Sequence, residues 1–344
     1  MFAIREAGAI TESSSEQKMA EVICVHRGEK RMNGLDLSRA YWETYGAPMI
    51  QEQFPSLEGR IAAGLTGPGS ECYGFDDEVS RDHDFEPGFC LFLPGEDAVD
   101  RKTAFQLERA YAKLPASFQG FDRQKMAPVG GQRHGVFRRE EYYRNHLGCL
   151  PEEMTWEKWL RLPQHVLAEA VNGVLFRDDS GLMEKGRALL RAMPEDVRRK
   201  RLAGHLLMMA QSGQYNYQRC LKHGETGGAQ LAVGQFAEHA LNALFLLHGQ
   251  YRPFYKWSFR ALRLLPEGEE LGRSLEWLLT TGNEEPLAED KYFCMEGICS
   301  QIIDLLQDRQ LTEAVCGDLE KHAHSVNDGI RDGEIRNLNI LYCV

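Results

Sequence analysis

The stretch GPGSECYGFDDEVSRDHDF, residues 67–85, joins two short apolar segments that predict buried strands. The first segment is IAAGLT at residues 61–66, and the second is FCLFL at residues 89–93. Glycine and proline directly follow each segment, as is common where strands end. The sequence therefore predicts a strand, a glycine–serine turn, an acidic loop and a second strand.

Gly69 and Ser70 lie in the turn that follows the first predicted strand. A glycine at such a turn lets the backbone approach a phosphate, whose oxygens can then be held by free N–H groups and a serine hydroxyl. We therefore expect Gly69 and Ser70 to bind phosphate. The alternative is an ordinary turn, because glycine–serine pairs are common in loops.

Asp82 and Asp84 stand two positions apart, shortly before the second predicted strand. In an extended segment such residues share a face, so both carboxylates are expected to point the same way. Two oxygen ligands beside a phosphate-binding turn suit Mg²⁺. Residues 76–86 carry six acidic side chains against one arginine, which also favours a cation site over a solvated loop.

The rest of the first 150 residues mixes helical and strand patterns. Apolar residues recur at helical spacing over residues 35–54 and 99–114, and a shorter segment at residues 135–137 predicts a third strand. Another helix is expected directly after that strand. We predict an α/β domain over residues 20–150, preceded by a small, polar and disordered segment at residues 1–19.

After Pro151 the strand signals almost vanish, and prolines separate long segments of helical periodicity. Helices are expected at residues 163–172, 183–193, 195–222, 227–249, 254–265, 268–281, 289–309 and 312–328, with a weak strand signal at residues 174–176. These helices predict an all-α helical bundle domain over residues 151–344. The predicted class is α+β, a mixed sheet with flanking helices followed by a helical bundle.

Charge and composition exclude several classes of function. The net charge of −11 makes nucleic acid an unlikely partner, because nucleic-acid surfaces are usually basic. The compact basic run at residues 198–201 is expected to be a solvated helix face. No segment reaches the roughly 18 apolar residues that cross a membrane, and the N-terminus lacks a signal-peptide core. With nine scattered cysteines, we expect a reduced, cytoplasmic protein.

The order of strand, glycine–serine turn and Asp-x-Asp pair resembles the nucleotidyltransferase superfamily, which transfers a nucleoside monophosphate from a triphosphate. Residues 35–93 resemble a bacterial family of uncharacterised nucleotidyltransferase-like proteins. In the second half, Gln214–Asn216, Arg219 and the Gly224-Glu225 pair are also similar to that family. Residues 251–257, YRPFYKW, resemble a motif in the helical domain of kanamycin- and streptomycin-type nucleotidyltransferases.

This resemblance implies roles for the residues of the turn and the acidic pair. Gly69 and Ser70 would hold the β- and γ-phosphates of ATP or another nucleoside triphosphate. Asp82 and Asp84 would ligate Mg²⁺ and act in catalysis.

Nucleotidyltransferases usually carry a third carboxylate on the following strand, where it holds the metal or deprotonates the acceptor. The strand predicted at residues 134–138 carries no acidic residue. Glu140, Glu141 and Asp122 lie near it in sequence, and the helical half is another source of carboxylates. Either one of these acts instead, or catalysis is impaired.

The helical half offers further candidates. By analogy with antibiotic-modifying relatives, Glu225 or Glu238 could serve as a general base. The alternatives are a helix-dipole contact for Glu225 and an ion pair for Glu238. Lys256 and Arg219 could neutralise triphosphate charge, although Lys256 also suits a packed helix start.

Two functional hypotheses follow. The first is a Mg²⁺-dependent nucleotidyltransferase that uses ATP or another nucleoside triphosphate, with an unidentified hydroxyl acceptor. The second is a catalytically impaired nucleotide-binding or regulatory module, which the missing strand carboxylate favours. Residues 289–309 are apolar on more than one face, so a homodimer is a further expectation.

Overall fold

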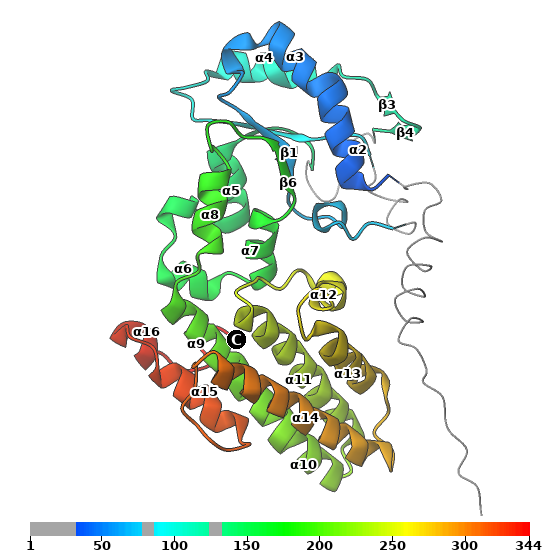
Figure 1. Ribbon diagram of the computed structural model, residues 1–344, viewed down its shortest axis with the longest axis vertical. Coiled ribbons are helices and arrows are strands. Elements are labelled where there is room, and N and C mark those ends of the chain that lie inside the picture. Colours follow the sequence, from blue (N-terminus) through cyan, green and yellow to red (C-terminus); the bar gives the residue numbers. More distant parts are fainter. Residues whose placement is uncertain (1–31, 78–85, 124–132) are drawn as a thin grey trace, which may run out of the picture.

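The computed structural model describes residues 32–77, 86–123 and 133–344. In this part of the chain, a mixed sheet with helices on both faces lies at one end and a bundle of helices at the other (Figure 1). The predicted α+β class is confirmed. The predicted disordered segment and the pair Asp82 and Asp84 lie outside the described residues.

Within the described residues, the main sheet has four strands in the order β5-β2-β1-β6. They are β1 Ala62–Leu65, β2 Cys90–Leu93, β5 Gly135–Arg138 and β6 Val174–Arg177. β1 is antiparallel to β2 and β6, whereas β2 is parallel to β5. The carboxyl end of β1 therefore lies at the same end of the sheet as the amino ends of β2 and β5. We call this the exit end.

Strand β6 shows that the sheet includes residues beyond the predicted domain boundary at residue 150. It pairs with β1 on the side opposite to β2, with Leu65 facing Val174 across the ladder. The weak strand signal at residues 174–176 is therefore confirmed. The predicted boundary after residue 150 is too early, because the sheet is completed by residues up to Arg177.

One face of the sheet is covered by the first helices of the described chain. α2 Gly34–Tyr41, the π-helical segment η1 Trp42–Gly46 and α3 Ala47–Gln53 run on as a single helical segment, as predicted. The widened turns of η1 come just before Pro48, which has no N–H and whose ring would clash with a carbonyl in regular helix. α4 Arg101–Ala112 completes this layer, and an aromatic cluster fills the space beneath it.

The other face of the sheet packs against helices from the middle of the chain. They are α5 Arg139–Leu147, α6 Trp156–Arg161, α7 Gln164–Val171 and α8 Glu184–Arg191. Cys90 and Phe92 of β2 point into this layer, where buried tyrosine, tryptophan and leucine side chains surround them. A short hairpin, β3 Ser117–Phe118 and β4 Phe121–Asp122, was not predicted.

The helical half is built around one long rod. α9 Glu195–Met209, the π-helical segment η6 Ala210–Asn216 and α10 Tyr217–Lys222 are continuous, which confirms the predicted helix at residues 195–222. The remaining helices are α11 Thr226–Leu247, α12 Tyr255–Leu262, α13 Gly268–Thr280, α14 Leu287–Asp308, α15 Leu319–Asp328 and α16 Gly333–Asn337. A core of leucine, isoleucine, alanine and phenylalanine side chains joins them.

Two expectations for the helical half are wrong. Helix α15 begins only at Leu319, where Asp318 caps it, so residues 312–318 form a loop. The basic run is not a solvated face, because Lys200 and Arg201 are buried where α9 packs between neighbouring helices. The Lys200 ammonium bonds to Asn327 and to backbone carbonyls.

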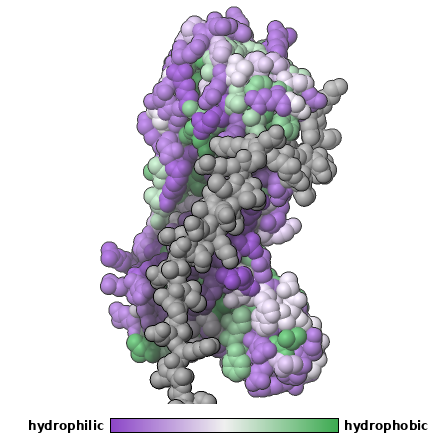
Figure 2. Space-filling view, turned by 45° about the vertical axis from the view of Figure 1, so that its right-hand side comes forward, coloured by the Kyte–Doolittle hydropathy of each residue, from purple (hydrophilic) through white to green (hydrophobic). Residues whose placement is uncertain are grey.

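Hydrophilic side chains dominate the face of the molecule shown in Figure 2, and its hydrophobic areas are separate and small. Among the described residues, no helix is both long and apolar enough to span a bilayer. The apolar residues of the long helices are instead used in the core.

Gly173, just before β6, lies close to the backbone at the end of β1. It adopts a φ of +66°, and a Cβ atom added there would lie 1.9 Å from the carbonyl oxygen of Leu65. We expect Gly173→Ala to lower the free energy of unfolding by at least about 3 kcal/mol, since both strain and a backbone clash result. Urea unfolding followed by circular dichroism measures this loss.

Gly148→Ala is the matched control, because Gly148 has a φ of +70° and open space around it. The same backbone strain without the clash is expected to reduce stability by only about 1 kcal/mol. Equal losses in the two variants would contradict the packing described for Gly173.

Two histidines meet in the core of the helical half. The Nδ1 atoms of His205 on α9 and His239 on α11 lie 2.9 Å apart. Burial lowers the pKa of His205 well below its ordinary value, and the neighbouring His239, Arg201 and Arg252 lower it further. Burial also lowers the pKa of His239, against the opposite effect of Glu238. One neutral ring must donate and the other accept.

Stability is therefore expected to fall as the pH drops below 6.5. Because the folded pKa values of His205 and His239 are depressed, their stabilising contribution is present above the unfolded pKa and is lost as protonation becomes favourable in the unfolded chain. Urea unfolding at pH 7.5 and 5.5 should show a loss of about 1 kcal/mol for each histidine. In His205→Gln the loss should be smaller, and an identical pH dependence would contradict the assignment.

Candidate functional site

The chain turns sharply where it leaves β1. Gly69 has a φ of +149°, and a Cβ there would lie 2.3 Å from a carboxylate oxygen of Glu71. Ser70 is buried, and its carbonyl accepts the N–H groups of Tyr73 at 3.1 Å and Phe75 at 2.8 Å. The predicted glycine–serine turn is therefore confirmed as a tight bend over residues 67–70, followed by the short 3-10 turn η3 Glu71–Tyr73.

Asn172 fixes this bend to the rest of the sheet domain. Its side-chain amide donates to the carbonyl of Gly67 at 2.9 Å, and its Oδ1 accepts the Gly67 N–H at 2.9 Å. The next residue, Gly173, donates its N–H to the carbonyl of Cys72 at 2.9 Å. Both sides of the bend are therefore held by the connection between α7 and β6.

Charged pairs gather around the exit end. Arg133 Nη1 lies 3.8 Å from a carboxylate oxygen of Glu71, and the carboxylate of Glu86 lies 3.1 Å from His134 Nδ1. Arg133 and His134 directly precede β5, and Glu86 precedes β2. The topology of the sheet thus brings together charges that are far apart in the sequence.

The candidates named for a third carboxylate are elsewhere. Glu140 and Glu141 follow β5 at the opposite end of the sheet, where Arg138 Nη1 donates to the carbonyl of Pro94 at 2.8 Å. Because β5 runs parallel to β2, the residues that follow β5 lie at the end of the sheet opposite to the bend. Asp122 lies in the small hairpin and accepts a hydrogen bond from Ser117. Among the described residues, the carboxylates near the exit end include Glu71, Glu86 and Glu169, and Glu169 interacts electrostatically with Arg133.

A cavity of about 390 Å³ opens beside the bend. It is lined by Leu65, Thr66, Pro68, Glu71, Cys72, Cys90, Arg133, His134, Phe137, Tyr142, Asn145 and His146. The rings of Tyr142 and His146 are stacked with centroids 4.7 Å apart. Burial raises the pKa of Cys90 to about 12, so this thiol stays protonated and is no nucleophile at neutral pH.

Helix α12 brings the helical half to the segment that follows the bend. Arg260 donates to the carbonyl of Phe75 and lies 3.5 Å from a carboxylate oxygen of Asp77. The Phe75 ring also packs near Trp257, with ring centroids 6.3 Å apart. Lys256 is exposed on the first turn of α12 and lies on the same helix face as Arg260, four residues later. The Lys256 ammonium lies over the ring of Trp257, 4.9 Å from its centroid.

Two other predicted residues are not brought to the exit end. Arg219 on α10 and Glu225, the residue before α11, lie at the far end of the long helices (Figure 1). α11 meets α7 at Asn242, which contacts Gln164, and Glu225 is about 25 Å further along the helix at 1.5 Å per residue. Arg219 lies against the ring of Tyr215 instead. The geometry does not support a catalytic role for Glu225 or phosphate binding by Arg219.

Glu238, the other carboxylate considered, is already paired. It accepts hydrogen bonds from Arg252 and Asn242. The Arg252 hydrogen bond and charge hold its pKa low despite the opposing effect of burial. The expected ion pair is confirmed.

Asp82 and Asp84, the predicted metal ligands, lie outside the described residues. Within residues 32–77, 86–123 and 133–344, no three His, Cys, Asp or Glu side chains gather as a metal site would require. Asp77 and Glu86, which flank the undescribed segment, both take part in the exit-end charge network.

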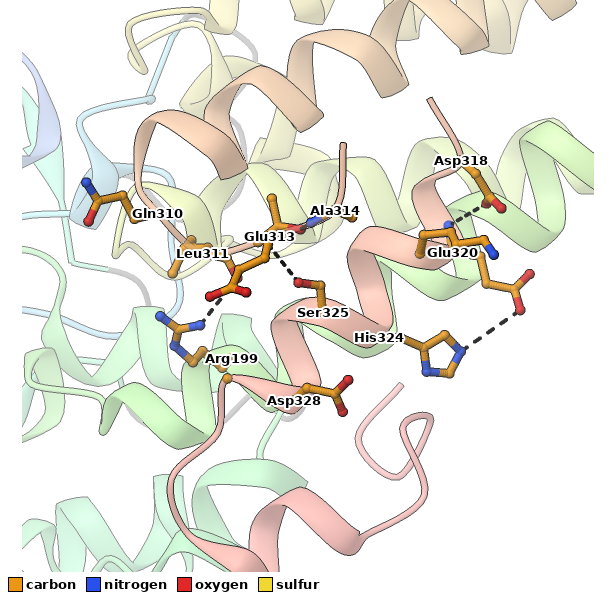
Figure 3. A pocket seen from close by; sticks show the side chains of 13 residues that line it. Arg199, Gln310, Leu311, Glu313, Ala314, Asp318, Glu320, His324, Ser325 and Asp328 are labelled. Atoms are coloured by element: carbon orange, nitrogen blue, oxygen red, sulfur yellow. Dashed lines mark hydrogen bonds and ion pairs between the residues drawn. The ribbon is translucent and has the colours of Figure 1, made fainter. Parts of the chain in front are cut away.

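A larger cavity, of about 750 Å³, lies between the loop after α14 and helix α15 (Figure 3). Its polar groups bond mainly to one another. Arg199 donates to the carbonyl of Leu311, and Ser325 accepts the N–H of Glu313. His324 and Glu320 form an exposed pair. This cavity lies in the helical half, and no residue of the glycine–serine bend lines it.

The fold and its site define an α+β chain with a tight glycine–serine bend at the end of a mixed sheet. Its sequence matches a domain of unknown function (DUF4037) over residues 159–258. Among solved structures it is similar to a nucleotidyltransferase-like protein from Exiguobacterium sibiricum 255-15. The two share 14% identity over 86% of this chain and 81% of that chain, with a TM-score of 0.33. No curated protein matches the sequence significantly.

Sequence reasoning missed several residues around the bend: Asn172, Arg133, His134, Arg260 and Arg187, whose guanidinium donates to Thr66 Oγ1 at 3.0 Å. Asn172 and Arg187 lie within the matched residues 159–258 but carry no local motif. Arg260 follows the YRPFYKW motif by one helical turn, which is the signal that could have found it.

Proposed function

We propose that the chain is a Mg²⁺-dependent nucleotidyltransferase that moves a nucleoside monophosphate from ATP or another nucleoside triphosphate to a hydroxyl acceptor. One observation carries the proposal. The bend over residues 67–70 leaves β1 at the end of the sheet where β2 begins, and the Asp82-x-Asp84 pair shortly precedes β2 in the sequence.

The bend would bind the β- and γ-phosphates through its backbone N–H groups and the Ser70 hydroxyl. Lys256 would approach the triphosphate from the helical half, since α12 contacts the segment after the bend. Both contacts place positive or partly positive groups where pyrophosphate develops charge, and such preorganised charge lowers the barrier.

Asp82 and Asp84 would hold Mg²⁺, because a pair of carboxylates is a suitable donor set for this ion. When bound by these residues, Mg²⁺ would supply charge neutralisation for the triphosphate and would lower the pKa of an attacking hydroxyl. The acceptor oxygen forms a bond to the α-phosphorus, and the bond from that phosphorus to the bridging oxygen breaks. Pyrophosphate leaves with the electron pair.

The hydroxyl proton needs an acceptor at the exit end. His134 lines the cavity beside the bend, and Glu86 contacts its Nδ1. A carboxylate in this position fixes the orientation of the ring. This pair would replace the strand carboxylate that is missing from residues 134–138.

The second candidate function is a nucleotide-binding module without turnover. The lack of an acidic residue in strand β5 favours it. Such a module would bind ATP and Mg²⁺ at the same bend but release no pyrophosphate with any acceptor. The acceptor chemistry of the kanamycin and streptomycin enzymes remains one option for the active form.

Asp82→Asn is expected to reduce Mg²⁺-dependent pyrophosphate release from ATP by at least about a hundredfold, because a metal ligand is lost. Pyrophosphate is measured with small-molecule, protein and RNA acceptors. Asp97→Asn is the control, since Asp97 is exposed beyond the opposite end of β2. Equal release by wild type and Asp82→Asn would refute the metal role.

A second pair of variants compares Lys256, on the helix that contacts the segment after the bend, with Glu225, at the far end of the helical half. Lys256→Gln should raise the KM for ATP by about tenfold, because a charge near the triphosphate is removed. Glu225→Gln should leave kcat and KM within about twofold, because the residue is remote. Steady-state kinetics on both variants checks this, and a large loss in Glu225→Gln alone would instead favour the sequence-based assignment.

A further inference from the structure

Arg187 on α8 lies directly behind the bend. Its side chain is 2% exposed, and its Nη2 atom donates to Thr66 Oγ1 at 3.0 Å and to the carbonyl of Asn172. Thr66 is the residue between β1 and Gly67, and Asn172 is the residue that fixes Gly67. The guanidinium therefore contacts both supports of the bend.

The charge of Arg187 has no ionic partner among the described residues. The acidic residue of its own helix, Glu184, forms its ion pair with Arg191 and acts on Arg187 only at longer range. The Nε atom is buried without a hydrogen-bond partner in the described chain. Tyr142 and Tyr143 also face the guanidinium, but both are neutral, since burial raises the pKa of each hydroxyl. A guanidinium cannot shed its proton in a protein, so the site holds a full buried charge.

An unbalanced buried cation is unfavourable unless an anion comes close. The field of Arg187 reaches the cavity, because it acts to lower the pKa values of the Cys72 and Cys90 thiols there, against the larger effect of burial. Low polarity around the guanidinium also keeps this field from being screened. A phosphate at the bend would supply the missing negative charge.

We infer that Arg187 is a positioning residue for a pyrophosphate or triphosphate group bound at residues 67–70. It holds Thr66 and Asn172 in place, and its charge raises the affinity of the bend for a polyphosphate anion. The inference rests on the proposed function, because it concerns the phosphate portion of the same substrate.

Arg201 provides a matched control in the helical half. It is also a buried guanidinium that donates to backbone carbonyls, those of Trp159 and Leu162, and its Nε atom has no hydrogen-bond partner in the described chain. Arg201 contacts neither Thr66 nor Asn172. Replacing either arginine by methionine removes one buried charge, but only Arg187→Met removes it from behind the bend.

The test is calorimetric titration of the full-length chain with inorganic pyrophosphate and Mg²⁺ at several salt concentrations. Arg187→Met should weaken binding by at least about tenfold and flatten the salt dependence, because one positive charge is lost. Arg187→Lys should restore most of the affinity. Arg201→Met should bind like wild type, whatever its stability.

Thr66→Val tests the same contact if Arg187→Met does not fold. It removes the hydroxyl that Arg187 holds, and we expect about fivefold weaker binding. Wild-type affinity in Arg187→Met, or in Thr66→Val where that variant is needed, would overturn the inference but leave the proposed function intact. An equal loss in Arg201→Met would also overturn it. Failure of the wild type to bind pyrophosphate would contradict both.

Discussion

The two hydrogen bonds between Asn172 and Gly67 determine where the site lies. Gly67 leaves β1, and Asn172 ends α7 just before β6, so the pair ties the start of the bend to a strand more than a hundred residues later. The close approach of Gly173 to Leu65 adds a second constraint on the same junction. Without them, the backbone N–H groups of the bend would have no fixed direction, and the proposed phosphate site would not be preorganised.

The sheet topology turns this local constraint into a charged site. Because β1 is antiparallel to β2 and β2 is parallel to β5, the segments before β2 and β5 must meet the segment after β1. Glu71, Glu86, Arg133 and His134 are thereby concentrated at one end of the sheet. The same topology sends Glu140 to the other end, which is why nearness in sequence misidentified it.

Local sequence patterns predicted the strands and helices that depend on hydrophobic periodicity and turn residues. The alternation of apolar runs with glycine and proline located β1, β2 and β5, and helical periodicity located the unbroken rod from residue 195 to 222. Long-range pairing was beyond such patterns. The four-residue strand β6 has intermediate burial throughout and gave only a weak strand signal, and nothing in that local pattern showed that it pairs with β1. Glu225 was assigned to the site for a related reason. The sequence shows a break between two helices at this residue, but it does not show at which end of the bundle the break lies.

Among the described residues, helix α12 joins the helical half to the segment that follows the bend. Arg260 joins α12 to the backbone of Phe75 and to Asp77, so α12 is held against the segment between the bend and the acidic pair. Arg252, just before α12, is itself held by Glu238 and Ser258, which fixes the direction in which the helix starts. A substrate bound at the bend would therefore meet a charge from α12 on one side and the buried guanidinium of Arg187 behind it. This arrangement favours a ligand with several negative charges in a row over a single carboxylate, because the fields of both cations act on such a ligand.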